Sequence, residues 1–361
     1  MTTSAVKVFG FLVRSILMGM IAALFLFQFF PELLKPITEP EPVVEPKPEI
    51  SSYADIIDEA SKSVVNIRTF NIERQRLYPY QPELRVSGGS GVIVSDLGYI
   101  VTNYHVIANA ENLTIELKDG RTAIPQLIGF DVATDLAVLK INLENVPYMI
   151  MNSAIVPRMG DIVITIGYPL GVGQVSSIGI ASPSMTQVRI AEYEDYIFTD
   201  ASTLPGNSGG ALINSNGDLL GIVTSKLSAQ GFSFAISTKL AMDVIEQLVN
   251  QGRVIRGWLG FSGGPLDRER REKYGESSYI VNGITVDGPA AKAGLLNNDI
   301  VVAIDGMSAE TAIDLHQLIA SYKPGTQVTL DIIRNDEKLT LTLTVEERPE
   351  SQNKSLDTLN R

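Results

Sequence analysis

The sequence has no cysteine, one tryptophan and only two histidines. The absence of cysteine excludes disulfides, thiolate catalysis and zinc–cysteine sites. His105 and His316 are too few for a metal site built from several imidazoles, and they are the only candidates for an imidazole base. Positive charge is also scarce, because 29 Lys and Arg residues face 41 Asp and Glu residues, which gives a net charge of −12. We expect no nucleic-acid partner, since phosphate backbones attract basic surfaces.

The length of 361 residues exceeds what one ordinary core supports and predicts two or so domains. From residue 52 to 252, short apolar runs such as SGVIVSD, LTIELKDG and DIVITIGYP alternate with Gly, Asn and Asp turns. Repeated short strands of this kind predict a mostly β domain, either a sandwich or a barrel. Thr238 is the expected N-cap of a closing helix that ends at Gly252.

The longest apolar segment is N-terminal, where residues 8–30 contain one charged side chain, Arg14. Its length matches the roughly 20 residues that span a bilayer, with Arg14 reaching toward the interface. Lys7 and Arg14 lie on its N-terminal side, so the positive-inside rule predicts cytoplasmic residues 1–7 and export of the rest. A cleaved signal peptide is the alternative. The segment ends in bulky FQFF without a small-x-small cleavage site, which favours an uncleaved transmembrane anchor.

Three further segments follow from composition and periodicity. Residues 31–51 are rich in Pro and Glu, cannot bury apolar surface and are predicted to form an extended linker. Residues 253–348 form a second predicted domain, with an amphipathic helix in TAIDLHQLIASY and strands in QVTLDIIR and LTLTLTVEE. Residues 349–361 read as a polar tail.

A serine lies among glycines in the string GNSGG, which contains Gly206 and Ser208. A serine nucleophile needs a tight turn that exposes its Oγ, and it needs unobstructed backbone N–H groups to bind an oxyanion. The glycines around Ser208 can supply both. An ordinary glycine-rich turn is the alternative interpretation of the string.

Two more residues complete a candidate triad. His105 follows the alternating run GYIVTN, which predicts a strand that carries the imidazole at its end. Asp135 precedes the apolar run LAVLKI, where a carboxylate must find donors, and a histidine Nδ1–H is suitable. Taken alone, His105 could be a structural histidine, and Asp135 could be a turn aspartate, as could Asp131. The order His, Asp, Ser is that of chymotrypsin-like proteases, which places the site in a cleft between two barrels.

The strings GSGVIVSDLGYIVTNYHVI, ATDLAVLKI and TDASTLPGNSGGALIN resemble the HtrA family of serine proteases. The resemblance covers residues 52–347. It implies a chymotrypsin-like double β-barrel protease domain over residues 52–252, followed by one PDZ domain over residues 253–348. It implies Ser208 as nucleophile, His105 as base, Asp135 as orienting group and an oxyanion hole from the N–H groups of Gly206 and Ser208. It requires no metal and no organic cofactor.

Three residues near the nucleophile in the sequence, Ser202, Ile222 and Thr224, are predicted to form the specificity pocket. The family prefers small or medium apolar residues before the scissile bond. Trypsin-like enzymes carry an aspartate six residues before the nucleophile, where this sequence has Ser202, which argues against Lys or Arg specificity. Ile222 and Thr224, on the strand after the nucleophile, are predicted walls of the same pocket.

The second domain contains a loop that resembles the carboxylate-binding loop of PDZ domains, Gly257-Trp258-Leu259-Gly260-Phe261. Successive backbone N–H groups in such a loop capture a peptide C-terminus, while the peptide adds as a strand to the sheet edge. We expect the later helix to line the groove with Leu315, Leu318 and Ile319. The alternative is a domain that only packs, with Trp258 as a core aromatic. His316, on the same helix, is interpreted as a surface histidine.

One PDZ domain, an N-terminal anchor and a proline-rich linker resemble the DegS-type branch of the family. That branch implies a homotrimer in the bacterial inner membrane with its catalytic part in the periplasm. It also implies activation by C-termini of misfolded outer-membrane proteins, with a transmembrane anti-sigma factor as the substrate in envelope-stress signalling. Tyr53 and Phe70 fall where the family has aromatic trimer contacts, and core packing is the alternative.

Several residues depart from the family pattern. Leu204 replaces an Asn, and Ser202-Thr203 replace small apolar residues. Arg189 is the only arginine available in the loop that relays activation in the family, and it lies earlier than the usual spacing. Two other functions stay open, namely a general periplasmic quality-control protease or chaperone and a non-catalytic peptide-binding scaffold.

Overall fold

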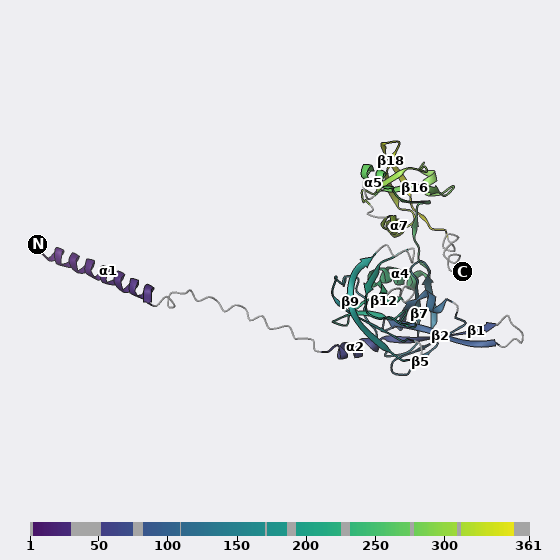
Figure 1. Cartoon of the computed structure of the whole chain (residues 1–361), viewed down its shortest axis with the longest axis horizontal. Coiled ribbons are helices and arrows are strands. Elements are labelled where there is room, and N and C mark those ends of the chain that lie inside the picture. Colours follow the sequence, from purple (N-terminus) through teal and green to yellow (C-terminus); the bar gives the residue numbers. More distant parts are fainter. Residues whose placement is uncertain are drawn as a thin grey trace. The chain divides into compact units, whose positions relative to one another are not determined.

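The computed structural model describes residues 3–29, 52–74, 82–108, 110–169, 172–185, 193–224, 232–274, 278–308 and 312–349. It divides into two compact units, residues 1–51 and 52–361. In the first unit, helix α1 (Thr3–Phe29) contains the stretch Lys7–Phe29, whose length and mean hydropathy of 2.1 suffice to cross a membrane (Figure 1). The whole of the predicted linker, residues 350–361 of the predicted tail and the last residue of the predicted anchor lie outside the described residues.

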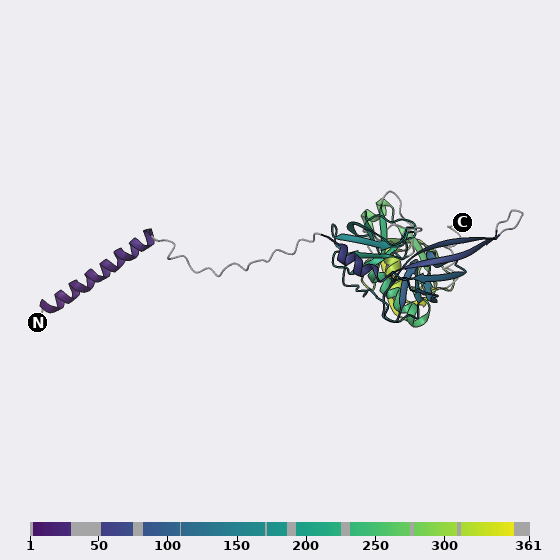
Figure 2. The same cartoon turned by 90° about the horizontal axis from the view of Figure 1, so that it is seen from below.

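The second unit begins with helix α2 (Ala54–Ser61) and a seven-stranded antiparallel sheet. Its strands, in the order β5-β4-β1-β2-β3-β7-β6, are β1 (Val64–Arg74), β2 (Pro82–Ile93), β3 (Tyr99–Asn103), β4 (Asn112–Glu116), β5 (Thr122–Ala123), β6 (Gln126–Asp131) and β7 (Leu136–Lys140). Alternating apolar side chains such as Ile67 and Ile100 are fully buried on one face. Figures 1 and 2 show the far ends of β1 and β2 extending beyond the rest of the sheet.

The following segment forms a closed antiparallel barrel with the order β10-β13-β12-β11-β8-β9. Its strands are β8 (Ile162–Gly167), β9 (Val175–Met185), β10 (Tyr196–Thr199), β11 (Ala211–Asn214), β12 (Leu219–Thr224) and β13 (Ser233–Ser237). The sheet and the barrel share one hydrophobic core, because Val101 and Leu136 of the sheet cluster with Ile164 and Ile213 of the barrel. The predicted mostly β architecture is confirmed.

Helix α4 (Thr238–Gln251) closes this part of the chain, as predicted. Its buried residues Val244 and Leu248 join the shared core. The predicted N-cap was wrong by one residue, because Ser237 accepts the hydrogen bond from the N–H of Leu240, and Thr238 is the first helical residue. Both residues have hydroxyls, so composition alone could not separate them. The helix ends at Gly252 as expected, with φ 72°.

The C-terminal part has its own core around Val281, Ile304 and Leu330. A five-stranded sheet contains β15 (Phe261–Pro265), β16 (Tyr279–Ile284), β17 (Ile300–Ile304), β18 (Gln327–Arg334) and β19 (Glu337–Thr344). A smaller ladder pairs β14 (Gly257–Trp258) with β20 (Glu346–Glu347). The helices are α5 (Arg268–Tyr274), α6 (Pro289–Lys292) and α7 (Ala312–Ser321), and α7 is the amphipathic helix that the sequence predicted.

Candidate active site

Ser208 lies in the turn between β10 and β11. Gly206 and Gly209 on either side have φ values of 104° and 83°, a region that residues with a Cβ rarely adopt. A Cβ on Gly209 would also lie 2.0 Å from the carbonyl oxygen of Ser90. The turn is anchored to β12, because Gly209 N–H donates to Val223 O and Val223 N–H donates to Gly210 O, both at 2.8 Å. The glycines therefore permit the tight turn that the sequence predicted.

His105 lies on α3 (Tyr104–Ile107), a one-turn helix that directly follows β3. The predicted strand therefore ends two residues before the imidazole, at Asn103. Backbone contacts fix this turn against the next loop: Tyr104 N–H donates to Asp135 O, and His105 N–H donates to Asp135 Oδ1, each at 3.0 Å.

The structure brings the three predicted triad residues together. His105 Nδ1 lies 2.6 Å from Asp135 Oδ2, and His105 Nε2 lies 3.0 Å from Ser208 Oγ. Both distances are within hydrogen-bond range. Asp135 and Ser208 are buried, whereas the His105 side chain keeps 26% of its surface exposed. The imidazole is thus the part of the triad that an approaching substrate can reach most readily.

The loop that presents Asp135 is held by its own hydrogen bonds. Asp135 has φ 58°, a left-handed conformation that aspartate tolerates better than most residues. Asn103 Nδ2 donates to its carbonyl oxygen at 3.2 Å. At the start of the same turn, Asp131 accepts from both the N–H and the hydroxyl of Thr134. The interpretation of Asp131 as a turn aspartate is thus confirmed, while Asp135 meets the imidazole.

Asp131 has a second partner that the sequence did not reveal. Arg256, just before β14, forms a bidentate ion pair with it, at 2.8 and 2.5 Å, and both side chains are about nine-tenths buried. Burial alone would raise the pKa of Asp131, but the bonds from Arg256 and Thr134 hold it below its ordinary value. The Arg256 guanidinium also lies 4.3 Å from the centre of the Tyr193 ring.

The negative charge of Asp135 also affects the pKa of a nearby phenol, that of Tyr196. Burial raises the pKa of Tyr196 well above its ordinary value, and the carboxylates of Glu194 and Asp135 raise it further. The Tyr196 hydroxyl therefore stays protonated at any physiological pH, which excludes it as a competing base beside His105.

The predicted specificity residues do not share one surface. Ser202 is exposed, and its carbonyl oxygen accepts a hydrogen bond from Thr165 Oγ1 at 3.2 Å. Ile222 is fully buried in the shared core, and Thr224 is buried as well. Next to Ser202, Thr203 Oγ1 and Ser233 Oγ lie 2.8 Å apart. The assignment of Ser202, Ile222 and Thr224 to a specificity pocket stays a prediction.

The predicted peptide-binding loop spans the end of β14 and the start of β15. Gly260 has φ 78°, while Leu259 is buried in the C-terminal core, as is Leu315 of α7. A hollow of about 160 Å³ adjoins this loop and is lined by Tyr193, Gly257, Trp258, Leu259, Phe261, Ser262, His316, Ile319 and Arg348. His316 is exposed, as expected, but sequence reasoning missed that it lines this hollow. Trp258 is half-buried and lines the hollow rather than filling the core.

Two hydrogen bonds join the C-terminal part to the segment that precedes β10. Gln317 Nε2 of α7 donates to Glu194 O at 2.5 Å, and Arg348 Nη1 donates to the Tyr193 hydroxyl at 3.1 Å. The backbone N–H of Tyr193 also donates to Ala133 O, with an N···O distance of 3.5 Å, and Ala133 belongs to the turn that carries Asp135. The peptide hollow and the triad are therefore connected through a short chain of contacts.

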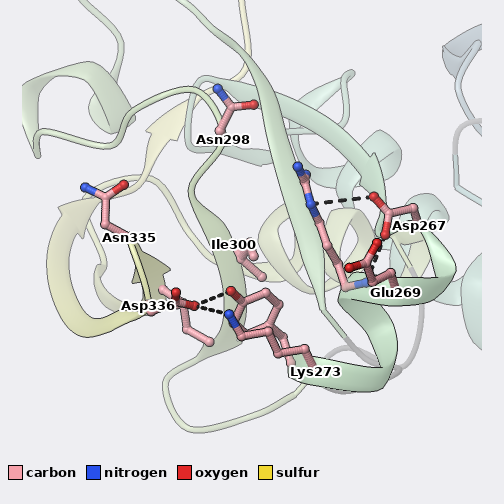
Figure 3. Close-up of a pocket in the computed structure, with 10 residues that line it drawn as sticks. Asp267, Glu269, Lys273, Asn298, Ile300, Asn335 and Asp336 are labelled. Carbon is pink, nitrogen blue, oxygen red and sulfur yellow. Dashed lines mark hydrogen bonds and ion pairs between the residues drawn. The ribbon is translucent and has the colours of Figure 1, made fainter.

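A second hollow, of about 470 Å³, lies on the C-terminal part between α5 and the β18–β19 turn (Figure 3). Figure 3 shows Lys273 facing Asp336, which accepts hydrogen bonds from both Lys273 Nζ and the Tyr274 hydroxyl. Arg270 pairs with Asp267 on the opposite side. These four charges are matched in pairs, and Glu269, the fifth charged residue of the lining, gives the hollow a small excess of negative charge. Within the described ranges, no group of three or more His, Asp or Glu residues could hold a metal ion.

The remaining predicted residues are placed as follows. Tyr53 precedes α2 and packs against the shared core, and Phe70 is half-buried on β1. Arg189 lies outside the described residues. Sequence reasoning also missed Ser90, a fully buried residue of β2 that contacts the Ser208 turn. A serine in the strand GGSGVIV gives no sequence signal that its hydroxyl has a partner far along the chain.

Comparisons with known proteins agree with the two folded parts of the chain. A family model described as "Trypsin-like peptidase domain" matches residues 89–222, and one described as "PDZ domain" matches residues 257–345. "Serine endoprotease DegS" of Escherichia coli (strain K12) is 36% identical, with 94% of this chain and 98% of that protein covered. A "Probable periplasmic serine endoprotease DegP-like" of Halomonas elongata is 34% identical, with coverage of 84% and 72%. The solved structure "HtrA-type protease AlgW with decapeptide" is 40% identical, covers 82% of this chain and 99% of its own, and has a TM-score of 0.74.

Proposed function

This chain belongs to the HtrA family of serine endoproteases, and we propose that Ser208, His105 and Asp135 are its catalytic triad. The observation that carries the proposal is the pair of distances centred on His105, 3.0 Å from Nε2 to Ser208 Oγ and 2.6 Å from Nδ1 to Asp135 Oδ2. Nucleophile, base and orienting group are thus within hydrogen-bond reach of one another.

The geometry supports a two-step acyl transfer. Ser208 Oγ attacks the peptide carbonyl carbon as its proton passes to His105 Nε2, and Asp135 stabilises the imidazolium through Nδ1–H. The N–H groups of Gly206 and Ser208 bind the oxyanion that develops on the carbonyl oxygen. His105 then protonates the leaving amine, and a water molecule, activated by the same imidazole, hydrolyses the acyl–serine bond.

We propose further that peptide binding to the PDZ domain regulates this site. The related HtrA-type protease AlgW has been solved with a decapeptide, and the hollow beside the Gly257–Phe261 loop, which Trp258 lines, is the candidate site for such a ligand in this chain. Tyr193 lines the same hollow, and its hydroxyl accepts a hydrogen bond from Arg348. The guanidinium of Arg256 lies over the Tyr193 ring. Arg256 in turn pairs with Asp131, at the start of the turn that carries Asp135. A peptide that displaces Tyr193 would therefore act on the turn that positions Asp135.

The cellular setting follows from the anchor and from the relatives. The apolar helix α1 supports a single-pass protein of the bacterial inner membrane, and the periplasmic DegP-like relatives support a catalytic part in the periplasm. We propose a homotrimer that senses C-termini of misfolded outer-membrane proteins and cuts a transmembrane anti-sigma factor. Tyr53 and Phe70 are candidate trimer contacts, and Arg189 is a candidate relay residue.

A second candidate is general quality control, supported by the similarity to DegP-like proteases. Coverage favours the regulatory function, because this chain covers 98% of the DegS relative but 72% of the DegP-like one. Casein degradation by the full chain, with and without a C-terminal peptide, separates the two. The regulatory function predicts slow basal cleavage that peptide stimulates, whereas fast cleavage without peptide supports quality control.

A fluorophosphonate probe tests whether the site is an enzyme at all. We expect it to modify Ser208 in the presence of an activating peptide, and mass spectrometry of the labelled fragment identifies the residue. If Ser208 stays unmodified while the peptide binds, the protein is a peptide-binding scaffold rather than a protease.

A further inference from the structure

Ser90 makes four hydrogen bonds although no part of it reaches solvent. It lies on β2, where it is 0% exposed. Its N–H donates to Ser208 O at 2.7 Å, and its carbonyl oxygen accepts from Thr102 Oγ1 at 2.7 Å. Its hydroxyl donates to Gly206 O at 2.8 Å and accepts from Tyr168 N–H, also at 2.8 Å. A buried hydroxyl with both a donor and an acceptor partner is fully specified in orientation.

These contacts fix the backbone on both sides of the nucleophile. Ser90 binds the carbonyl oxygens of Gly206 and Ser208, the two residues whose N–H groups the proposed mechanism uses. The peptide plane of Gly206 and Asn207 lies between the two planes that carry those N–H groups. Gly206, at φ 104°, has no Cβ to restrict its ψ angle, so this plane is held by hydrogen bonds at its two ends. Asn207 N–H donates to Leu204 O at 2.9 Å, and Gly206 O accepts from the Ser90 hydroxyl at 2.8 Å.

The same hydroxyl connects the turn to the segment that follows β8. Tyr168 N–H binds the Ser90 hydroxyl, and a Cβ on Gly167 would lie 3.0 Å from Ser90 Oγ and 2.8 Å from Asn207 Oδ1. The backbone of Gly167 and Tyr168 is therefore in close contact with both Ser90 and the Ser208 turn. A shift of this segment would reach Gly206 through the Ser90 hydroxyl as well as through its direct contact with the Ser208 turn.

We propose that Ser90 is a positioning residue whose hydroxyl holds the Gly206–Asn207 peptide in the orientation that aims the oxyanion-binding N–H groups at the substrate. The inference rests on the proposed function of Gly206 and Ser208. It assigns Ser90 no contact with substrate. Its effect is on the transition state, because the oxyanion exists there and not in the bound ground state.

The test is the substitution Ser90→Ala in the full chain, kept in detergent and saturated with activating C-terminal peptide. Loss of one oxyanion donor lowers kcat by about 10²–10³, so we expect an indirect loss of about 10- to 100-fold in kcat. We expect KM to change less than about twofold, since ground-state binding is untouched. Affinity for a peptide boronic acid, which forms a tetrahedral adduct with Ser208, should fall by the same factor as kcat.

Ser87→Ala is the matched control. Ser87 lies on the same strand and its hydroxyl pairs with Thr69 Oγ1 at 2.7 Å, away from the Ser208 turn. It should leave kcat, KM and boronic-acid affinity unchanged. Thermal unfolding of each variant measures any structural effect separately.

A purely structural Ser90 would give a lower melting temperature with normal kcat in the folded fraction, and that result overturns the proposal. If Ser90→Ala does not fold, Ser90→Cys keeps the size of the side chain with a weaker donor, and it must still lower kcat at unchanged KM. A normal kcat in Ser90→Cys also overturns the proposal. Failure of the proposed function gives a different result, because fluorophosphonate would then leave Ser208 unmodified in the wild-type chain.

Discussion

The triad and the PDZ hollow differ in where their residues come from. The triad comes from the sheet and the barrel, which share one hydrophobic core, and His105 joins Asp135 to Ser208. The hollow draws Trp258 from the C-terminal part and Tyr193 from the segment before β10. The triad residues thus all come from the proteolytic part of the chain, whereas the lining of the hollow is shared between the two parts that peptide binding would have to couple. If so, chemistry and sensing should be separable by mutation, and residues between them should affect both.

The largest expected effect separates chemistry from sensing completely. Ser208→Ala removes the proposed nucleophile and should abolish cleavage, by a factor of about 10⁶ or to the detection limit of the assay. The PDZ hollow contains no atom of Ser208, so peptide affinity measured by fluorescence anisotropy should equal that of wild type. Weakened peptide binding in a folded Ser208→Ala variant would show that the two sites are not separable.

The next largest effect is expected for Arg256→Ala, which breaks the ion pair between Arg256 and Asp131. It leaves the Asp131 carboxylate buried without its cation, which typically destabilises a protein by about 3–5 kcal/mol. A carboxyl whose folded pKa is depressed contributes stability above its unfolded pKa and loses it as pH falls through the folded pKa. The difference in unfolding free energy between wild type and Arg256→Ala should therefore be largest near neutral pH and shrink below about pH 4.

Urea unfolding at several pH values measures that difference. Arg158→Ala is the control, because Arg158 also pairs with an aspartate, Asp161, but is exposed. It should change unfolding little at any pH. An Arg256→Ala variant with wild-type stability and wild-type stimulation by peptide would remove this pair from the proposed connection.

A smaller change tests the contact at the hollow. Tyr193→Phe removes only the hydroxyl that Arg348 donates to. One such bond contributes about 0.5–1.5 kcal/mol, so the ratio of kcat/KM with and without peptide should fall about two- to tenfold, through a higher basal rate. Tyr322→Phe, which removes a hydroxyl bonded to Asp305 within the C-terminal part, is the matched control. Equal ratios in wild type and Tyr193→Phe would contradict the connection.

The smallest expected effect concerns His316→Gln. His316 lines the hollow and contacts the Tyr279 ring edge-on, so its loss should weaken peptide binding a few-fold, on the order of 0.5–1 kcal/mol. Cleavage of a short substrate without activating peptide should stay the same. Lys323→Ala, an exposed change just beyond α7, serves as control. Tighter binding, or a change in basal cleavage, would mean that the histidine acts outside the hollow.

The sequence predicted the elements whose signals are local. Short strings of sequence predict the strand before His105, the turn at Asp135 and the glycine-rich turn of the candidate nucleophile Ser208. The order of these three residues along the chain predicts the chymotrypsin-like arrangement of the site. Contacts between distant residues could not be predicted this way. Asp131 and Arg256 are 125 positions apart, and Ser90 and Gly206 are 116 apart. A buried ion pair or a buried hydroxyl has the same letters in the sequence as an exposed one.

The shared core also limits how such an enzyme can be switched on. Apolar residues of β3 and β7 pack directly with those of β8, β11 and α4, so the two halves of the proteolytic part cannot swing apart without exposing that interior to water. Hinge opening of the kind seen between loosely joined lobes is therefore ruled out as a gate. The proposed activation by peptide would therefore act through ångström-scale shifts of surface turns while the shared core stays in place, and the end of a peptide is large enough to cause shifts of that size.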